Sequence, residues 1–308
     1  SPEQSNVTSS GATIVAIITL ETFAGTWINT FIVCVLCIAW IKKKSLKPNE
    51  KILLLLGCCR FCYLCFSWVY SFLSIIYPYY LYVHIFQVVL FIQNFSNCSD
   101  FCVSTCLCVF YCIKIANFRS RFFIYLKVKI DRIVPWLLLG SVIFSLAMGI
   151  FVYSITDKPQ CNNSTSSGNI WKVNMKIDKH FFPFYFITGL LFVTSFTAVI
   201  SSALPLLFSL WRHKCKMQKN SMKSLSIDAH IKAMKSIISF FIMYNINFIT
   251  LIVTMIYSIE ENPMIFLIYV FLHAFPGVHS LILIFSNAKL EKTLLRILPC
   301  VKCKVCMR

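Results

Sequence analysis

The sequence predicts an all-α membrane protein, a bundle of seven transmembrane helices with an extracellular N-terminus and a cytosolic C-terminus. Of its 308 residues 58% are hydrophobic and only 13% are charged, and the mean hydropathy is +0.75. Such a chain is too apolar for a soluble globular domain. It contains seven apolar stretches, each long enough to cross a hydrocarbon core about 30 Å thick. Lys and Arg residues gather in alternate linkers between these stretches.

The apolar stretches define a membrane domain at residues 12–288. An extracellular N-terminus at 1–11 precedes it, and a basic, Cys-containing cytosolic tail at 289–308 follows it. We expect each stretch to form one helix. The stretches run from Ala12 to Ile41, Ile52 to Tyr77, Val83 to Ile113, Ile133 to Ile155, Phe181 to Trp211, Ala233 to Ile259 and Met264 to Phe285.

The distribution of charge and of glycosylation sequons predicts the orientation. Most of the 29 Lys and Arg residues lie in the tail and in the linkers after the first, third and fifth stretches. The positive-inside rule places these segments in the cytosol. Sequons at Asn6, Asn162 and Asn163 all lie on the opposite, outer side, where glycosylation is expected. The sequence therefore predicts a multi-pass glycoprotein of the plasma membrane.

The third stretch is predicted to be the central helix of the bundle. Helical spacing places Gln93, Asn97, Asp100 and Ser104 in one polar stripe on an otherwise apolar rod. A carboxylate at bilayer depth is costly in contact with lipid, so it faces partners or a water-filled cavity and marks a functional site by default. The stripe therefore predicts a polar seam that the other helices surround.

Short motifs at the cytosolic ends and inner halves of the stretches identify a family. They are Glu21, Gly25 and Asn29 in the first stretch, Leu56-Gly57-Cys58-Cys59-Arg60 in the second, Ser104-Thr105-Cys106-Leu107 and Lys114-Ile115-Ala116-Asn117-Phe118 in the third, His230-Ile231-Lys232-Ala233 at the sixth and His279-Ser280 in the last. In order and spacing, the chain resembles the type 2 taste receptors, the bitter taste receptor family of G protein-coupled receptors. Gln93 and Cys102 stand where Trp is common in that family, so ligand preference is not carried over.

The resemblance implies a function. The expected activity is that of a bitter taste receptor, which binds small, partly apolar bitter compounds in an outer-half pocket and activates a gustducin-like heterotrimeric G protein of the inhibitory class. It points to these ligand-binding positions: Leu90, Gln93, Asn94 and Asn97, with Trp68, Tyr244 and Tyr269 as further ones. Helix packing is the plainer interpretation of most aromatic residues. Asn97 is the strongest of the set because a mid-span amide on an inner face needs a partner.

Helix depth predicts a second, buried polar cluster. A rise of about 1.5 Å per residue puts Arg60 about 13 Å from the cytosolic edge and Glu21 about 30 Å from it, too far apart to pair easily. Arg60 is therefore expected to pair with Asp100. The whole cluster is predicted to contain Asn29, Arg60, Asp100, His279 and Ser280. A purely structural ion pair and a switch between inactive and active states are both open interpretations.

The cytosolic face is expected to contact a G protein and membrane lipid. By resemblance, the loop from Lys114 to Lys129 and the cytosolic ends of the fifth and sixth stretches frame the G protein cleft. The G protein-facing residues implied are Lys114, Asn117, Phe118, His213, Lys216, His230 and Lys235. A basic surface of this kind also suits anionic lipid. In the tail, Cys300, Cys303 and Cys306 suggest palmitoylation more than zinc binding, because a fourth ligand and a nearby His are missing.

Other classes of protein fit less of the sequence. A vomeronasal-type chemosensory receptor is the nearer alternative. A small polytopic transporter or channel, in which the polar stripe would be a solute path, is the more distant one. An enzyme is not expected, because the sequence has no metal-ligand cluster, nucleophile triad or phosphate-binding loop. No cofactor and no nucleic-acid partner are predicted.

Overall fold

The computed structural model contains helices and no strand in the part of the chain that it describes. That part comprises residues 2–76, 83–115, 121–156 and 264–306, with positions 189–190, 193–201, 204, 208, 211, 238–239, 241–242, 244–246 and 248–249. Backbone alone is described at 2–12, 14, 70, 73–76, 83–86, 115, 122, 155–156, 264–269, 272 and 298–306. The predicted fold class, an all-α membrane protein, is confirmed, whereas the orientation in the membrane stays a prediction.

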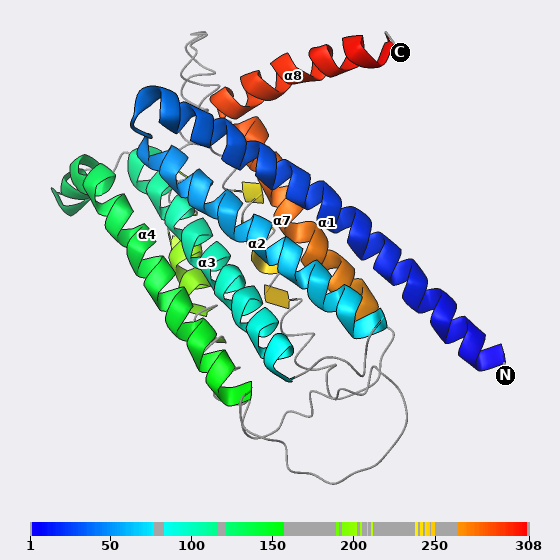
Figure 1. Ribbon diagram of the computed structural model, residues 1–308. Helices are drawn as coiled ribbons and strands as arrows, with labels where there is room; N and C mark the ends of the chain where they lie inside the picture. Colours follow the sequence, from blue (N-terminus) through cyan, green and yellow to red (C-terminus); the bar gives the residue numbers. More distant parts are fainter. Residues whose placement is uncertain are drawn as a thin grey trace.

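The helices that form the described bundle agree with the predicted first four stretches and the last one (Figure 1). These five are α1 (Pro2–Lys43), α2 (Pro48–Ile76), α3 (Val83–Ile115), α4 (Arg121–Thr156) and α7 (Met264–Ser286), and α8 (Ala288–Cys306) follows α7. Within the described residues, 4 helices are long and apolar enough to cross a membrane, and His273–Ser286 of α7 is a shorter apolar helix. α3 packs between α2 and α4, and α1 packs against α2 and α7.

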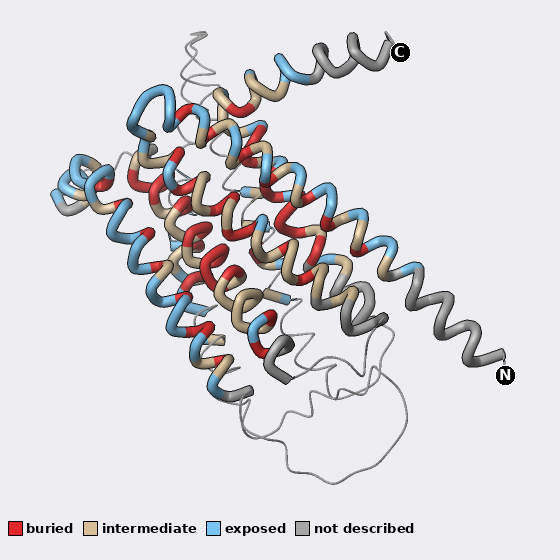
Figure 2. Tube along the Cα trace, viewed as in Figure 1, coloured by how far each residue is buried: buried red, intermediate tan, exposed pale blue. Residues whose placement is uncertain are grey.

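α3 is the central helix of this group. In the apolar part of α3, 67% of the span is buried inside the protein, against 28% in α1 and 22% in α4. Figure 2 shows the same contrast, with buried residues concentrated on α3 and exposed residues along the outer side of α4. The prediction that the third stretch is the core of the bundle is therefore confirmed, and the exposed apolar faces of α1 and α4 are surfaces suited to lipid.

Two helices differ from the sequence prediction. α4 begins at Arg121 and not at Ile133, so much of the predicted loop from Lys114 to Lys129 is helical. The tail was expected only as a basic segment, but it forms α8. Hydropathy marks the part of a helix that crosses the membrane, whereas Leu, Lys and Arg continue a helix beyond that part because they are good helix formers.

The turns between helices have identifiable signals. Lys44 follows the end of α1 with φ of 54°, and its N–H donates to the Trp40 carbonyl at 2.7 Å, which is an αL cap. Pro48 begins α2, a position where its missing N–H is not needed. At the other end of the chain, the Asn287 side-chain oxygen accepts from the Lys289 N–H at 3.0 Å and caps α8.

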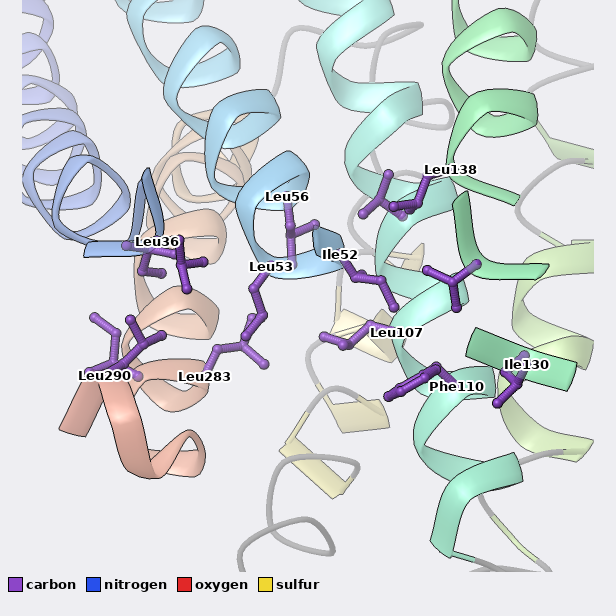
Figure 3. Close-up of a cluster of buried hydrophobic side chains, with 14 of the residues drawn as sticks. Leu36, Ile52, Leu53, Leu56, Leu107, Phe110, Ile130, Leu138, Leu283 and Leu290 are labelled. Atoms are coloured by element: carbon purple, nitrogen blue, oxygen red, sulfur yellow. The ribbon is translucent and has the colours of Figure 1, made fainter. Parts of the chain in front are cut away.

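A cluster of buried apolar side chains joins the helices where α7 meets α8. Leu36 of α1, Leu53 of α2 and Leu283 of α7 meet Leu290 of α8, which is 0% exposed (Figure 3). The same cluster continues through Leu107 of α3 to α4. In a membrane, such contacts stabilise the bundle through close van der Waals packing. These contacts fix the end of the bundle where α7 meets α8. They also fix how far α1, α2, α3 and α7 are shifted along one another, and so the relative positions of the buried polar residues on these helices.

Candidate functional site

Arg60 of α2 lies at the centre of a buried polar network. Its Nε donates to Asp100 Oδ1 of α3 at 2.6 Å. Nη1 donates to Ser280 Oγ of α7 at 2.8 Å, and Nη2 donates to Ser104 Oγ at 3.3 Å. Nη2 also lies 2.7 Å from His279 Nδ1. A guanidinium has donors but no acceptor, so His279 accepts at Nδ1 and carries its proton on Nε2.

Asp100 supplies the negative charge that balances Arg60. The two side chains are only 9% and 1% exposed, and the other groups around the guanidinium are neutral. A charge-assisted hydrogen bond of this kind is stronger than a neutral one. Removing either partner of a buried pair strands the other charge, which is strongly destabilising. The ion pair therefore joins α2 to α3 in a way that neither residue can sustain alone.

The network continues to α1 through Ser280. The Ser280 hydroxyl donates to Asn29 Oδ1 at 2.7 Å, and Asn29 Nδ2 donates to the Gly25 carbonyl at 2.8 Å. Ser280 and Asn29 are 1% and 0% exposed. Because Ser280 also accepts from Arg60, its hydroxyl is used in both directions. A continuous chain of hydrogen bonds thus connects α3, α2, α7 and α1.

Two glycines allow α1 and α7 to approach closely enough for this contact. A Cβ atom at Gly277 would lie 3.1 Å from the Gly25 Cα. A Cβ at Gly25 would lie 2.8 Å from Leu64 Cδ1 and 3.5 Å from the Gly277 Cα. Small residues at helix contacts in membranes permit this backbone approach. Any larger residue at Gly277 would push α1 away from Ser280.

The structure brings together the residues of the predicted polar cluster, and the Arg60–Asp100 pairing is the one expected from helix depth. Ser104 was placed on the polar stripe but not in the cluster, although its spacing of four residues from Asp100 was an available signal. A role for this network in activation stays a proposal.

A second polar seam, on the other side of α3, was missed by the sequence reasoning. Cys106 Sγ lies 3.7 Å from Ser141 Oγ of α4, and the Ser145 hydroxyl donates to the Ser141 carbonyl at 2.7 Å. Ser145 is 0% exposed. The signal was the spacing of two serines by four residues on an apolar helix, which places both on one face.

The predicted ligand-binding residues of α3 lie toward its N-terminal half and are partly buried. Asn94 Nδ2 donates to the Leu90 carbonyl at 2.9 Å, so its amide is bonded to its own helix. For Gln93 and Asn97, the described residues provide no side-chain hydrogen bond. Half-buried amides without protein partners retain their hydrogen-bonding capacity for another molecule.

The three aromatic residues predicted to bind ligand differ in their surroundings. Tyr244 is 1% exposed and meets Phe101 of α3 edge-on, with ring centroids 5.3 Å apart. Trp68 donates from Nε1 to Thr19 Oγ1 at 3.1 Å and stacks on Phe72 at 5.1 Å, so its ring packs between α1 and α2. Tyr269 lies in α7, and its side chain is outside the described residues.

On the predicted G protein face, the structure describes Lys114. Its Nζ lies 2.9 Å from Asp131 Oδ2 in a pair that is 34% and 48% exposed, respectively. The remaining positions lie outside the described residues: Asn117, Phe118, His213, Lys216, His230 and Lys235, with the sequon residues Asn162 and Asn163. Asn6 lies in α1 and Cys300, Cys303 and Cys306 in α8, with their side chains outside the described part. Their predicted roles stay predictions.

Comparison with known proteins identifies the family. The family model described as "Taste receptor protein (TAS2R)" matches residues 7–302. The human protein "Taste receptor type 2 member 2" is 31% identical over 295 residues, which cover 92% of this chain and 95% of that protein. Rat "Taste receptor type 2 member 41" is 32% identical over 302 residues, 92% of this chain and 94% of that protein.

The chain belongs to the type 2 taste receptor family. A further member, macaque "Taste receptor type 2 member 7", is 31% identical over 280 residues, 88% of this chain and 87% of that protein. The family comprises bitter taste receptors of the G protein-coupled class, which are multi-pass proteins of the plasma membrane and not enzymes. The match over nearly the full chain favours neither the vomeronasal-type nor the transporter alternative.

Proposed function

We propose that this type 2 taste receptor binds small, partly apolar bitter compounds in the outer half of the bundle and activates a gustducin-like G protein of the inhibitory class. The observation that carries the ligand site is the state of Asn97. Its amide is half-buried on the central helix, and the described residues offer it no hydrogen-bond partner. An apolar site with a few polar groups suits flat compounds that carry a small number of hydrogen-bonding atoms.

Asn97 is also close in sequence to the buried network. It precedes Asp100 by three residues, so both lie on one face of α3. A ligand held by Asn97 would therefore contact the helix whose next turn is bonded to Arg60. The network has well-defined partners on α1, α2, α3 and α7. We infer that ligand binding changes the equilibrium between two arrangements of these partners, which is how coupling between separate sites arises.

The first experiment is calcium release in cells that express this receptor with a chimeric gustducin-type α subunit, screened against bitter plant alkaloids and terpenoids. The test variant is Asn97→Ala. The matched control is Asn245→Ala, which removes an amide whose Nδ2 is bonded to the Phe241 carbonyl of its own segment at 2.7 Å. Loss of two hydrogen bonds to a ligand predicts a potency decrease of about 10-fold or more in Asn97→Ala at equal surface expression.

The outcomes separate the parts of the proposal. A parent response that Asn97→Ala leaves unchanged would contradict the ligand site and keep the receptor function. An equal loss in Asn245→Ala would mean that the loss in Asn97→Ala does not report a ligand contact. The G protein class is tested separately, because pertussis toxin inactivates inhibitory α subunits. A response of the native pathway that the toxin does not reduce would contradict that class.

A further inference from the structure

A second group of buried polar side chains lies about two helical turns from the Arg60 network, toward the N-terminus of α1. Two contacts fix the register there. Gly25 of α1 faces Leu64 of α2 and Gly277 of α7. Beyond it, Thr19 accepts a hydrogen bond from Trp68 of α2. α1 and α7 run in the same direction and α2 runs opposite (Figure 1). Residues 21–22, 67 and 273 therefore lie at one level, between these two contacts.

Several buried oxygen atoms at this position in the bundle have no hydrogen-bond partner among the described residues. Thr22 and Ser67 are 5% and 1% exposed. Thr22 Oγ1, Ser67 Oγ and Glu21 Oε2 are buried, and no hydrogen-bond partner for them lies in the described part of the chain. His273, at 4% exposed, adds an imidazole on the α7 side. Buried polar atoms are nearly always paired in native proteins, so these oxygens indicate a bound species.

The charge at this level is negative. Arg60, the buried cation about two helical turns away, is already paired with Asp100. Glu21 has no ion pair with any residue that the structure describes. The Oε2 atom of Glu21 is buried, and a buried carboxylate oxygen without a counter-charge is costly, so it marks a site that receives one. Carboxylate and hydroxyl oxygens are hard ligands, which suit small hard cations or N–H donors.

We propose that Glu21, Thr22 and Ser67 form a subsite for a singly charged cation, either Na⁺ or the protonated amine of a small organic compound. A divalent ion fits less well, because calcium sites recruit several carboxylates. Within the described residues, no group of three or more His, Cys, Asp or Glu side chains could hold a metal ion. One carboxylate and two hydroxyls match a single positive charge. The subsite is separate from the proposed ligand contacts of α3 and does not depend on them.

The test measures the thermal unfolding of the purified full-length receptor in detergent. The buffer contains NaCl, propylammonium chloride or tetraethylammonium chloride at one ionic strength. Tetraethylammonium is the reference, because its quaternary nitrogen has no N–H donor and four ethyl groups keep the charge away from the oxygens. At a cation concentration of ten times Kd, the expected rise in Tm of the parent over this reference is about 2–4 °C. A rise with NaCl alone identifies the inorganic cation, and a rise with propylammonium alone identifies the organic one.

Variants tie the effect to the subsite. Glu21→Gln is expected to abolish the cation-dependent rise, and Thr22→Val and Ser67→Ala are expected to halve it or more. Asp131→Asn removes a carboxylate that is 48% exposed on α4 and should keep the full rise. The proposal is overturned if neither cation raises the Tm of the parent, or if Glu21→Gln responds as the parent does. Should Glu21→Gln not fold, an unchanged rise in both hydroxyl variants overturns it.

Discussion

Replacing Asp100 by Asn removes the negative charge that pairs with Arg60 among the described residues, while it keeps the size and an acceptor oxygen of the side chain. The guanidinium cannot lose its proton, and it is bonded otherwise to the neutral groups of Ser280, Ser104 and His279. Since Arg60 is 0% exposed, water cannot replace the lost counter-charge. The variant therefore leaves a buried, uncompensated cation.

The expected cost follows from this burial. Breaking a buried ion pair by removing one partner costs about 3–5 kcal/mol. Asn retains a hydrogen bond to Nε, so the lower end applies, at about 3 kcal/mol. For a chain of 308 residues, the corresponding fall in Tm is about 5 °C. Replacing both residues, as in Arg60→Met with Asp100→Leu, should cost less than the sum of the single changes, because no charge is stranded.

The assay is size-exclusion chromatography of detergent-solubilised receptor after stepwise heating. The control is Asp131→Asn, which breaks the Lys114–Asp131 pair; that pair is 34% and 48% exposed and should contribute less than about 1 kcal/mol. A Tm of Asp100→Asn within about 2 °C of the parent would refute the reasoning, as would equal effects of both variants. Agonist potency at equal surface expression then separates a switch from a structural pair: a structural pair lowers the Tm and leaves potency unchanged.

The remaining predictions concern packing and one helix cap, and the same heating assay checks them. Gly277→Ala should destabilise by about 1–3 kcal/mol, because the new Cβ would lie 3.1 Å from the backbone of α1. Gly140→Ala, where nothing lies within 4 Å, should stabilise by about 0.5–1 kcal/mol; the reverse order of the two Tm values would contradict the close contact. Leu290→Ala should cost about 2–5 kcal/mol, since Leu290 is 0% exposed, and a change below about 1 kcal/mol would mean that α8 is not anchored there. Lys44→Gly should stabilise by about 0.5–1 kcal/mol, because φ of 54° suits Gly better than Lys; an unchanged Tm would argue against the αL cap.

Parts of the candidate site were accessible from the sequence because helix geometry is regular. The spacing of Gln93, Asn97, Asp100 and Ser104 gave the inner face of α3. A fixed rise per residue put Arg60 about 13 Å from the cytosolic edge and Glu21 about 30 Å from it, which favoured Asp100 as the partner of Arg60. Since a membrane strongly disfavours unpaired charges, two opposite charges at one depth were expected to meet, and they do.

Other parts depended on neighbours that no local pattern reveals. Trp68 matched a pocket position by resemblance, yet its indole is bonded to Thr19 of α1. The rotation of α2 about its own axis decides which neighbour that ring meets, and the rotation is set by packing with other helices. Hydropathy also placed the start of the fourth helix too late, at Ile133, because charged residues alternate with apolar ones at 121–132, and the whole segment is helical.

The sequence by itself determined the class of the protein, its helical spans, the central place of the third helix and the family, because hydrophobic length, period and motif order are local properties of the chain. The tertiary structure decided which polar groups on different helices form hydrogen bonds and ion pairs with each other. Gly25 against Gly277 sets the distance between α1 and α7, and that distance lets Ser280 reach Asn29 at 2.7 Å. Such contacts join residues far apart in the chain. They exist only when the helices have packed, since packing fixes both the separation and the rotation of each helix.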